Sequence, residues 1–138
     1  MSMKSIKKQV KYCEKLKIIT KKKYSLIGSI YCPILDKYIV FNSVGIRHLQ
    51  YKSNRTPRTI QETIYKMRLF PFVVSVIKKS KHISSIRKIK IKIKDKMKDA
   101  VTYSIVYKTG YKKQISVRVI ILKVGNGNYK FYSVMKDK

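Results

Sequence analysis

Hydrophobic residues recur at helical spacing near the start of the chain. Within residues 5–23, apolar side chains fall on one face of a helix and lysines cover the other face. The apolar face consists of Ile6, Val10, Cys13 and Leu16. This pattern is typical of an amphipathic helix packed on a core, and Gly28 is expected to end that region.

Two short apolar runs follow, at residues 30–32 and 38–41. Their length, and the segment at residues 33–37 between them, predict two short strands joined by a turn. Asn42 or Ser43 then stands where a helix N-cap residue is favoured, so we expect a short helix through residues 45–49.

A polar break at residues 53–56 precedes the next helical pattern. Proline is favoured at the first position of a helix, so Thr56-Pro57 predicts a helix start. The residues predicted to form the buried stripe of this helix are Ile60, Ile64 and Met67. Pro71 is expected to break or kink it, with one or two further turns over residues 72–79.

The second half of the chain has the period of β-strands. Residues 88–94 alternate strictly between lysine and isoleucine, which predicts a strand with one dry face and one wet face. Further β-rich segments lie at 101–107, 114–123 and 129–135, with a hairpin signal, Gly-Asn-Gly-Asn, at residues 125–128. We expect the lysine row to be a solvated face that binds phosphate non-specifically and takes no part in catalysis.

The order of these elements predicts an α+β fold in one domain of 138 residues. Helices come first and are expected to pack on a C-terminal antiparallel sheet of about four strands. The predicted parts are an N-terminal helix at 1–27, short strands and helices at 28–80, and an antiparallel meander at 81–138.

Alternation in the last two strands predicts which side chains share a face. One face of the strand at 114–123 carries Val117, Val119 and Ile121, and the other carries Ser116 and Arg118. One face of the returning strand carries Tyr129, Phe131, Ser133 and Met135, and the other carries Lys130, Tyr132 and Val134. Arg118 is then either an edge residue that extends its charge into solvent or a phosphate clamp. The aromatic residues either stack on bases or pack in the core.

Charge narrows the class of partner. The chain has 34 Lys and Arg residues against 6 Asp and Glu, a formal net charge of +28. Nucleic acid, an anionic membrane and an acidic protein are the polyanions that such a charge can bind. AT-rich coding explains the preference for Lys over Arg, but it does not explain the shortage of acids. The charge therefore favours a nucleic acid.

No membrane span or exported chain is expected. The longest apolar stretch, residues 69–77, contains Pro71 and is too short to cross a bilayer. Residues 1–11 lack the apolar centre of a signal peptide, so we expect a cytoplasmic location and no membrane partner. Cys13 and Cys32 form no CxxC pair and are expected to be reduced, buried thiols.

The scarcity of acids argues against one kind of nuclease chemistry. Two-metal enzymes need several converging carboxylates, and the only close pair here, Asp95 and Asp99, is expected to mark a turn. RNA carries its own nucleophile in the 2′-hydroxyl, so it can be cut with acid–base help and fixed cations alone. We therefore expect RNA as the substrate, with no metal and no cofactor.

Two histidines could carry protons near neutral pH. His82 follows a lysine-rich helix end and is expected at the surface. His48 is either a proton carrier or a buried structural residue. Four cations surround it in the sequence and are candidates for holding RNA: Arg47, Lys52, Arg55 and Arg58.

Several segments resemble the barnase/EndoU/colicin/RelE-like nuclease superfamily, in particular its small phage and bacterial toxin-like branch. The first are Cys-Pro-Ile at 32–34 and the run at 39–49, which ends in Gly-Ile-Arg-His-Leu. The others are the strand at 115–122, the turn at 125–127 and Phe-Tyr-Ser-Val at 131–134. The resemblance extends, in order, from residue 29 to residue 135.

The resemblance implies a metal-independent ribonuclease fold, with N-terminal helices on a four-stranded antiparallel sheet. Members are typically toxins that cut tRNA or mRNA. The residues that fall on family-like motifs are His48, Arg118, Lys130 and Ser133. The family often has histidine where this chain has Lys130, which removes the second member of a histidine acid–base pair.

The leading hypothesis is an RNA endonuclease of toxin type. His48 would act as general acid or base, Arg118 and Lys130 would stabilise the phosphate, and Ser133 or Tyr132 would place the scissile group. Expected partners are tRNA or mRNA, including RNA on the ribosome, and an acidic antitoxin or immunity protein. A non-catalytic, ribosome-associated RNA-binding protein is the alternative. A cationic membrane-surface protein is a third class, which the strand-rich second half disfavours.

Overall fold

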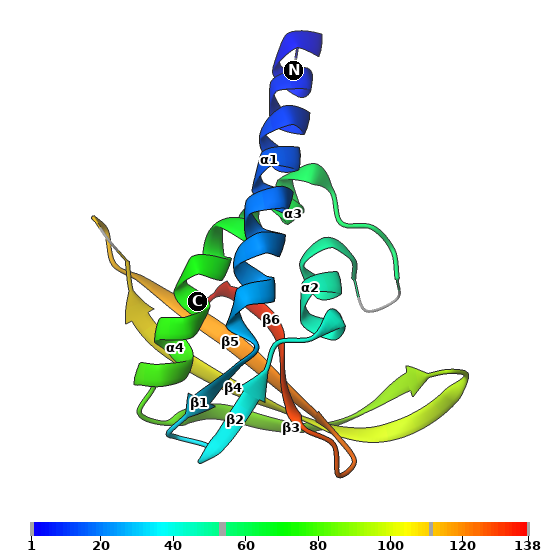
Figure 1. The fold of residues 1–138 in the computed structure, drawn as a ribbon, viewed down its shortest axis with the longest axis vertical. Helices are drawn as coiled ribbons and strands as arrows, with labels where there is room; N and C mark the ends of the chain where they lie inside the picture. Colours follow the sequence, from blue (N-terminus) through cyan, green and yellow to red (C-terminus); the bar gives the residue numbers. More distant parts are fainter. Residues whose placement is uncertain (1, 53–54, 111, 138) are drawn as a thin grey trace.

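A computed structural model describes residues 2–52, 55–110 and 112–137. Helices and strands within these ranges are shown in Figure 1. The helical elements are α1 (Met3–Ile27), α2 (Ser43–Gln50), α3 (Ile60–Leu69), a 3-10 turn η1 (Phe70–Phe72) and α4 (Val73–Lys79). The strands are β1 (Ser29–Cys32), β2 (Lys37–Val40), β3 (Ile83–Ile93), β4 (Lys96–Thr109), β5 (Ile115–Val124) and β6 (Tyr129–Lys136).

The strands form one sheet in the order β1-β2-β6-β5-β4-β3. The four strands β3 to β6 make the antiparallel meander that the sequence predicts. The hairpin of β1 and β2 extends it through a short parallel pairing of Ile39 with Tyr129 and Val40 with Lys130. The α+β class is confirmed, but a sheet of about four antiparallel strands was wrong: it has six described strands and is mixed. Strand β6 is the outer strand of the meander, so its outer side offers backbone groups for pairing, and β2 pairs with the first part of that side.

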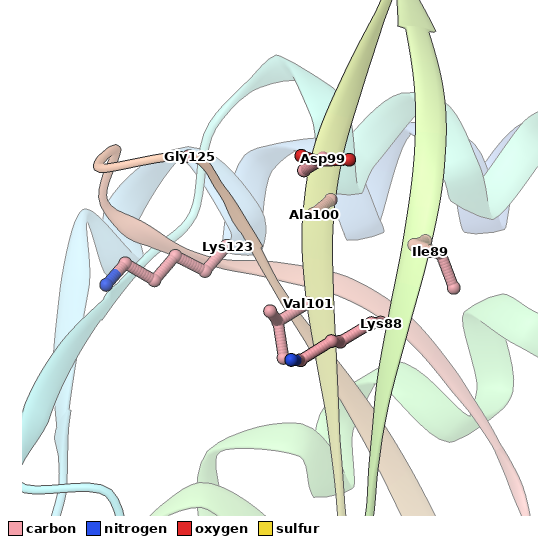
Figure 2. A pocket seen from close by; sticks show the side chains of 7 residues that line it. All are labelled: Lys88, Ile89, Asp99, Ala100, Val101, Lys123 and Gly125. Carbon is pink, nitrogen blue, oxygen red and sulfur yellow. The ribbon is translucent and has the colours of Figure 1, made fainter.

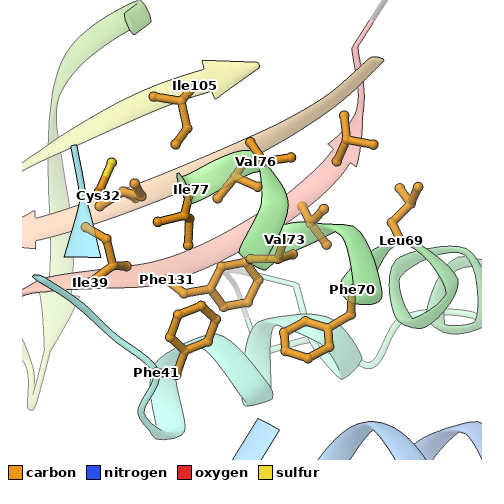
Figure 3. Packing of buried hydrophobic residues seen from close by; sticks show 14 of the residues in the cluster. Cys32, Ile39, Phe41, Leu69, Phe70, Val73, Val76, Ile77, Ile105 and Phe131 are labelled. Atoms are coloured by element: carbon orange, nitrogen blue, oxygen red, sulfur yellow. The ribbon is translucent and has the colours of Figure 1, made fainter. Parts of the chain in front are cut away.

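The core lies between α4 and the centre of the sheet (Figure 3). Val73, Val76 and Ile77 of α4 are fully buried. The strand residues Val117, Val119 and Ile121 are equally buried, which confirms their predicted common face. Phe131 brings the aromatic part of the core together, because its ring lies near those of Phe41, Phe70 and Tyr24.

Helix α1 is more exposed than the sequence pattern suggests. Cys13 is buried, but Ile6 and Val10 are 41% and 40% exposed, so burial of the apolar stripe was wrong for the first turns. Figure 1 shows the N-terminal part of α1 projecting beyond the rest of the molecule. Cys13 and Cys32 are both free and buried, as expected. Among the described residues, no helix combines the length and the apolar character needed to cross a membrane.

Helix α3 starts later than predicted. Its N-cap is Thr59, whose hydroxyl accepts a hydrogen bond from the Glu62 backbone N–H. Pro57 instead pairs with Tyr51 in an isolated bridge, so Thr56-Pro57 is not the helix start. The predicted buried stripe of this helix was also wrong in part, because Ile60 is 36% exposed while Thr63, Lys66 and Met67 are buried.

The predicted break at Pro71 is confirmed by η1, and Asn42 caps α2. Of the polar break at 53–56, residues 53–54 lie outside the described residues.

A β-bulge changes which side chains of β6 share a face. Ile121 lies opposite Phe131, but Ile120 lies opposite Ser133, so Tyr132 is an additional residue in β6. The alternation inverts at a bulge. Val134 therefore faces the core with Phe131, and Ser133 lies on the same face as Arg118; the predicted faces of β6 were wrong beyond Phe131.

The lysine row of β3 behaves as a solvated face. Its lysines are exposed and the isoleucines between them are half-buried. Two of the lysines are already paired, Lys90 with Asp99 at 3.3 Å and Lys92 with Asp95 at 3.9 Å. Asp95 lies in the turn between β3 and β4 as expected, whereas Asp99 lies within β4.

Candidate functional site

Helix α2 carries His48 against the edge of β6. The imidazole packs on the ring of Tyr132, with 4.3 Å between the ring centroids. Arg58 holds the same residue from the other side: its Nε donates to the His48 carbonyl at 2.9 Å, and its Nη2 lies 3.3 Å from His48 Nδ1. A guanidinium can only donate, so Nδ1 accepts and the neutral ring carries its proton on Nε2.

The surroundings of His48 keep its ring neutral. Burial, together with the positive charges of Arg58 and Lys66, lowers the pKa of His48 to about 4. At neutral pH, Nε2 is therefore a hydrogen-bond donor, and the ring nitrogen that could accept a proton is already bonded to Arg58. This geometry favours binding of an anion over proton abstraction.

Lys66 belongs to the same cluster, and sequence reasoning missed it. Its Nζ donates to the Val134 carbonyl at 2.7 Å and to Ser133 Oγ at 3.2 Å. Burial, with a further contribution from the charge of Arg58, lowers its pKa to about 8. One signal was available: Lys66 stands three residues after Thr63 and four before Phe70, which places all three on one helix face.

Helix α3 completes the edge of β6 beyond the end of β2. Lys66 satisfies the Val134 carbonyl, and the Tyr65 hydroxyl accepts from the Lys136 backbone N–H at 2.7 Å. Unpaired buried backbone groups are costly, so these two side chains replace the hydrogen bonds of a neighbouring strand. The cluster therefore holds α2 and α3 on the sheet in addition to presenting polar groups.

Of the other predicted catalytic residues, Ser133 lies in this cluster and Arg118 lies close to it. Arg118 is opposite Met135 and thus diagonal to Ser133 on one face of the sheet. Its Nε and Nη2 donate to Asp137 Oδ1 at 3.0 Å and 2.6 Å. The Asp137 carboxylate already pairs with the Arg118 guanidinium. Arg118 is therefore neither simply an edge residue that extends its charge into solvent nor simply a phosphate clamp. Lys130 is opposite Leu122, beyond the bulge, and is not brought into the cluster.

The predicted RNA-binding cations divide into one structural residue and three exposed residues. Arg58 contacts His48, and its side chain is 10% exposed. Arg47, Lys52 and Arg55 are exposed at the surface around α2 and the segment before α3. The Lys52 ammonium lies 4.0 Å from Glu62 Oε1, and Arg58 Nη1 lies 3.6 Å from Glu62 Oε2. His82 is exposed, as expected.

Comparisons with protein-family models, with curated proteins and with solved structures find no match to this chain. In the described part of the chain, no three His, Cys, Asp or Glu side chains gather where they could hold a metal ion.

The low pKa of His48 predicts an acid-sensitive fold. The unfolded histidine titrates near 6.5 and the folded one near 4, so between these pH values the unfolded chain binds more protons. Stability should therefore fall as pH drops from 6.5 towards 4, by at most about 1.4 kcal/mol per pH unit from this group. In urea unfolding at pH 4.5, 5.5 and 6.5, His48→Gln should flatten this dependence and the control His82→Gln should not. Equal slopes in the wild type and both variants would contradict the assignment.

Proposed function

We propose that this protein is a metal-independent endoribonuclease of toxin type that cuts tRNA or mRNA. The observation that carries the proposal is the cluster on β6, where Arg58 and Lys66 bring two positive charges to a neutral, donating His48. Such fixed charges favour a phosphate that gains negative charge during the reaction. The net charge of +28 supplies the long-range attraction for RNA.

In the proposed reaction, the 2′-oxygen attacks the adjacent phosphorus and gives its proton to water. The bond from phosphorus to the 5′-oxygen breaks, and that oxygen takes a proton from His48. The products are a 2′,3′-cyclic phosphate and a 5′-hydroxyl. Arg58 neutralises charge on the phosphate, and Lys66 holds Ser133 and the bulged strand in place.

The phosphate itself prepares His48 for this role. Two of the three causes of its low pKa are the positive charges of Arg58 and Lys66. A bound phosphate offsets those charges and draws the Arg58 guanidinium away from Nδ1, so the pKa of the imidazole rises and Nδ1 takes up a proton from solvent. His48 then becomes a general acid next to the leaving oxygen, a role that contributes about 10²–10⁴-fold to rate.

This proposal retains the resemblance to the barnase/EndoU/colicin/RelE-like superfamily, which includes toxins controlled by a second protein. An acidic antitoxin or immunity protein is the proposed protein partner, because a chain with 34 basic residues and 6 acidic ones attracts an acidic surface. The cytoplasm, where tRNA and mRNA lie, is the proposed place of action.

A second candidate function is non-catalytic RNA binding, for example on the ribosome. This second function is favoured because the candidate catalytic side chains already form hydrogen bonds or ion pairs within the protein. Arg118 is paired with Asp137, and Lys66 donates to Ser133 and to Val134. The same contacts would serve a purely structural role, with the exposed lysines binding RNA.

Cleavage in excess EDTA distinguishes the two functions. The purified protein should cut total RNA into fragments with 5′-hydroxyl and 2′,3′-cyclic phosphate ends. His48→Gln should slow cleavage by about 10²-fold or more, because it removes the proton donor. His82→Gln, which changes an exposed histidine, is the matched control and should cut at the wild-type rate. RNA that is bound but never cut would instead establish the binding function.

A further inference from the structure

The end of the sheet near the β5–β6 turn is hollowed on both sides of Lys123. One cavity of about 390 Å³ is lined by Lys88, Val101 and Lys123, among others. A second, of about 310 Å³, is lined by Tyr38, Lys123 and Tyr129, among others. Figure 2 shows the first cavity, with the side chains of Lys88 and Lys123 on its two sides and Val101 between them.

Aromatic rings lie next to these ammonium groups. Lys123 Nζ is 5.0 Å from the centroid of the Tyr129 ring, and that ring is 5.6 Å from the ring of Tyr103. Both tyrosines are half-buried and pack against the core, and Tyr129 lines the second cavity. Asp99 is an acidic residue in the lining of the first cavity, and it pairs with Lys90 at 3.3 Å.

We infer that this end of the sheet, termed here the tyrosine platform (Lys88, Tyr103, Lys123 and Tyr129), binds unpaired nucleotides of an RNA strand. Lys88 and Lys123 contact phosphates, and the tyrosine rings stack on bases. Stacking on aromatic side chains combined with a basic surface is the usual basis of single-strand binding. The inference rests on the proposed function, because it describes how the RNA substrate of the proposed ribonuclease is held.

The chemistry favours a single strand over a duplex. A tyrosine ring can stack only on a base whose face is exposed, and bases in a duplex are already stacked on their neighbours. The asparagines of the turn, Asn126 and Asn128, line the second cavity and can donate to and accept from exposed base edges. An intact helix would reach the lysines but not the rings.

The tyrosine platform and the cluster at His48 are linked by one strand. Tyr129 and Tyr132, which contacts His48, are three residues apart in β6, a distance of about 10 Å along the strand. One RNA strand can therefore occupy the platform while a neighbouring phosphate lies at His48. The platform would then determine that cleavage occurs next to unpaired nucleotides.

The test is a binding measurement with an uncleavable probe, a fluorescent single-stranded RNA octamer methylated at every 2′-oxygen. The double variant Lys88→Gln/Lys123→Gln should reduce the salt dependence of log K by about 1.4, because each phosphate contact in a single strand contributes about 0.7. Its affinity near 0.1 M salt should fall about 10-fold or more. Tyr129→Leu, which keeps an apolar side chain, should weaken binding by about 5- to 150-fold through lost stacking.

The matched control is Lys108→Gln/Lys112→Gln, which changes the net charge equally at two exposed positions outside the platform. A control that weakens binding as much as the platform double variant would overturn the inference, as would equally tight binding of a fully paired duplex. The lysine variants are surface changes, so they remain informative if Tyr129→Leu unfolds. Binding on the platform without cleavage of natural RNA would refute the ribonuclease but not the platform. If the platform variants cut natural RNA and bind the probe as the wild type does, the platform would be refuted but the ribonuclease would not.

Discussion

Gly45→Ala is expected to destabilise the protein by about 3 kcal/mol, although alanine normally favours a helix over glycine. A β-carbon at this position would lie 2.5 Å from Tyr24 Oη, 2.6 Å from Phe131 Cδ2 and 2.7 Å from the Phe131 backbone oxygen. None of these atoms is the end of a flexible side chain. Tyr24 is held by donation to the Asn42 carbonyl, and Phe131 lies in the core.

The measurement is urea unfolding followed by circular dichroism. Ser43→Ala, at an exposed position of the same helix, is the control and should change stability by no more than about 0.5 kcal/mol. A stable Gly45→Ala protein would mean that α2 does not approach β6 this closely, and the position of His48 on Tyr132 would have to be revised.

Arg58→Met should reduce kcat/KM by about 10²-fold or more, because in the proposed reaction Arg58 both neutralises the phosphate and positions His48. The substitution should also change a property that a merely structural residue would leave alone. Burial is the main cause of the low pKa of His48, and the charge of Arg58 is the next. The pKa should therefore rise part of the way from about 4 towards 6.5.

The imidazole can be titrated by proton NMR in a His82→Gln background, where His48 is the remaining histidine. Arg68→Met removes the same charge from an exposed position of α3 and is the matched control. It should leave both kcat/KM and the His48 titration unchanged. If Arg58→Met cuts RNA at the wild-type rate, Arg58 does not act on the substrate; if the pKa stays at about 4, its charge does not reach His48.

Local patterns in the sequence were enough to predict most elements of the fold. Strict alternation predicted β3, buried alternation predicted β5, and the Gly-Asn-Gly-Asn turn predicted the hairpin into β6. These signals lie within one element or one turn. The mixed character of the sheet depends instead on the pairing of β2 with β6, whose partners Ile39 and Tyr129 are far apart in the sequence.

The candidate site was predicted only in part for the same reason. His48 and Ser133 could be named from the sequence, but alternation placed Ser133 on the wrong face because a bulge exists only in a paired strand. Lys66 was not named as a candidate, since a lysine is seldom buried without a partner for its charge. That partner is the unpaired edge of β6, which no local pattern reveals.

The exposed beginning of α1 gives the helix a gradient of local stability. Lysines four residues apart, such as Lys4 with Lys8 and Lys7 with Lys11, repel each other along it, and Ile6 and Val10 gain little from burial. The far end is held by Thr20 and Tyr24, which are buried. The first turns therefore open at a small fraction of the free energy of global unfolding, and a polyanion that neutralised their lysines would order them. Binding of such a polyanion and helix formation would then be one coupled equilibrium at this end of the molecule.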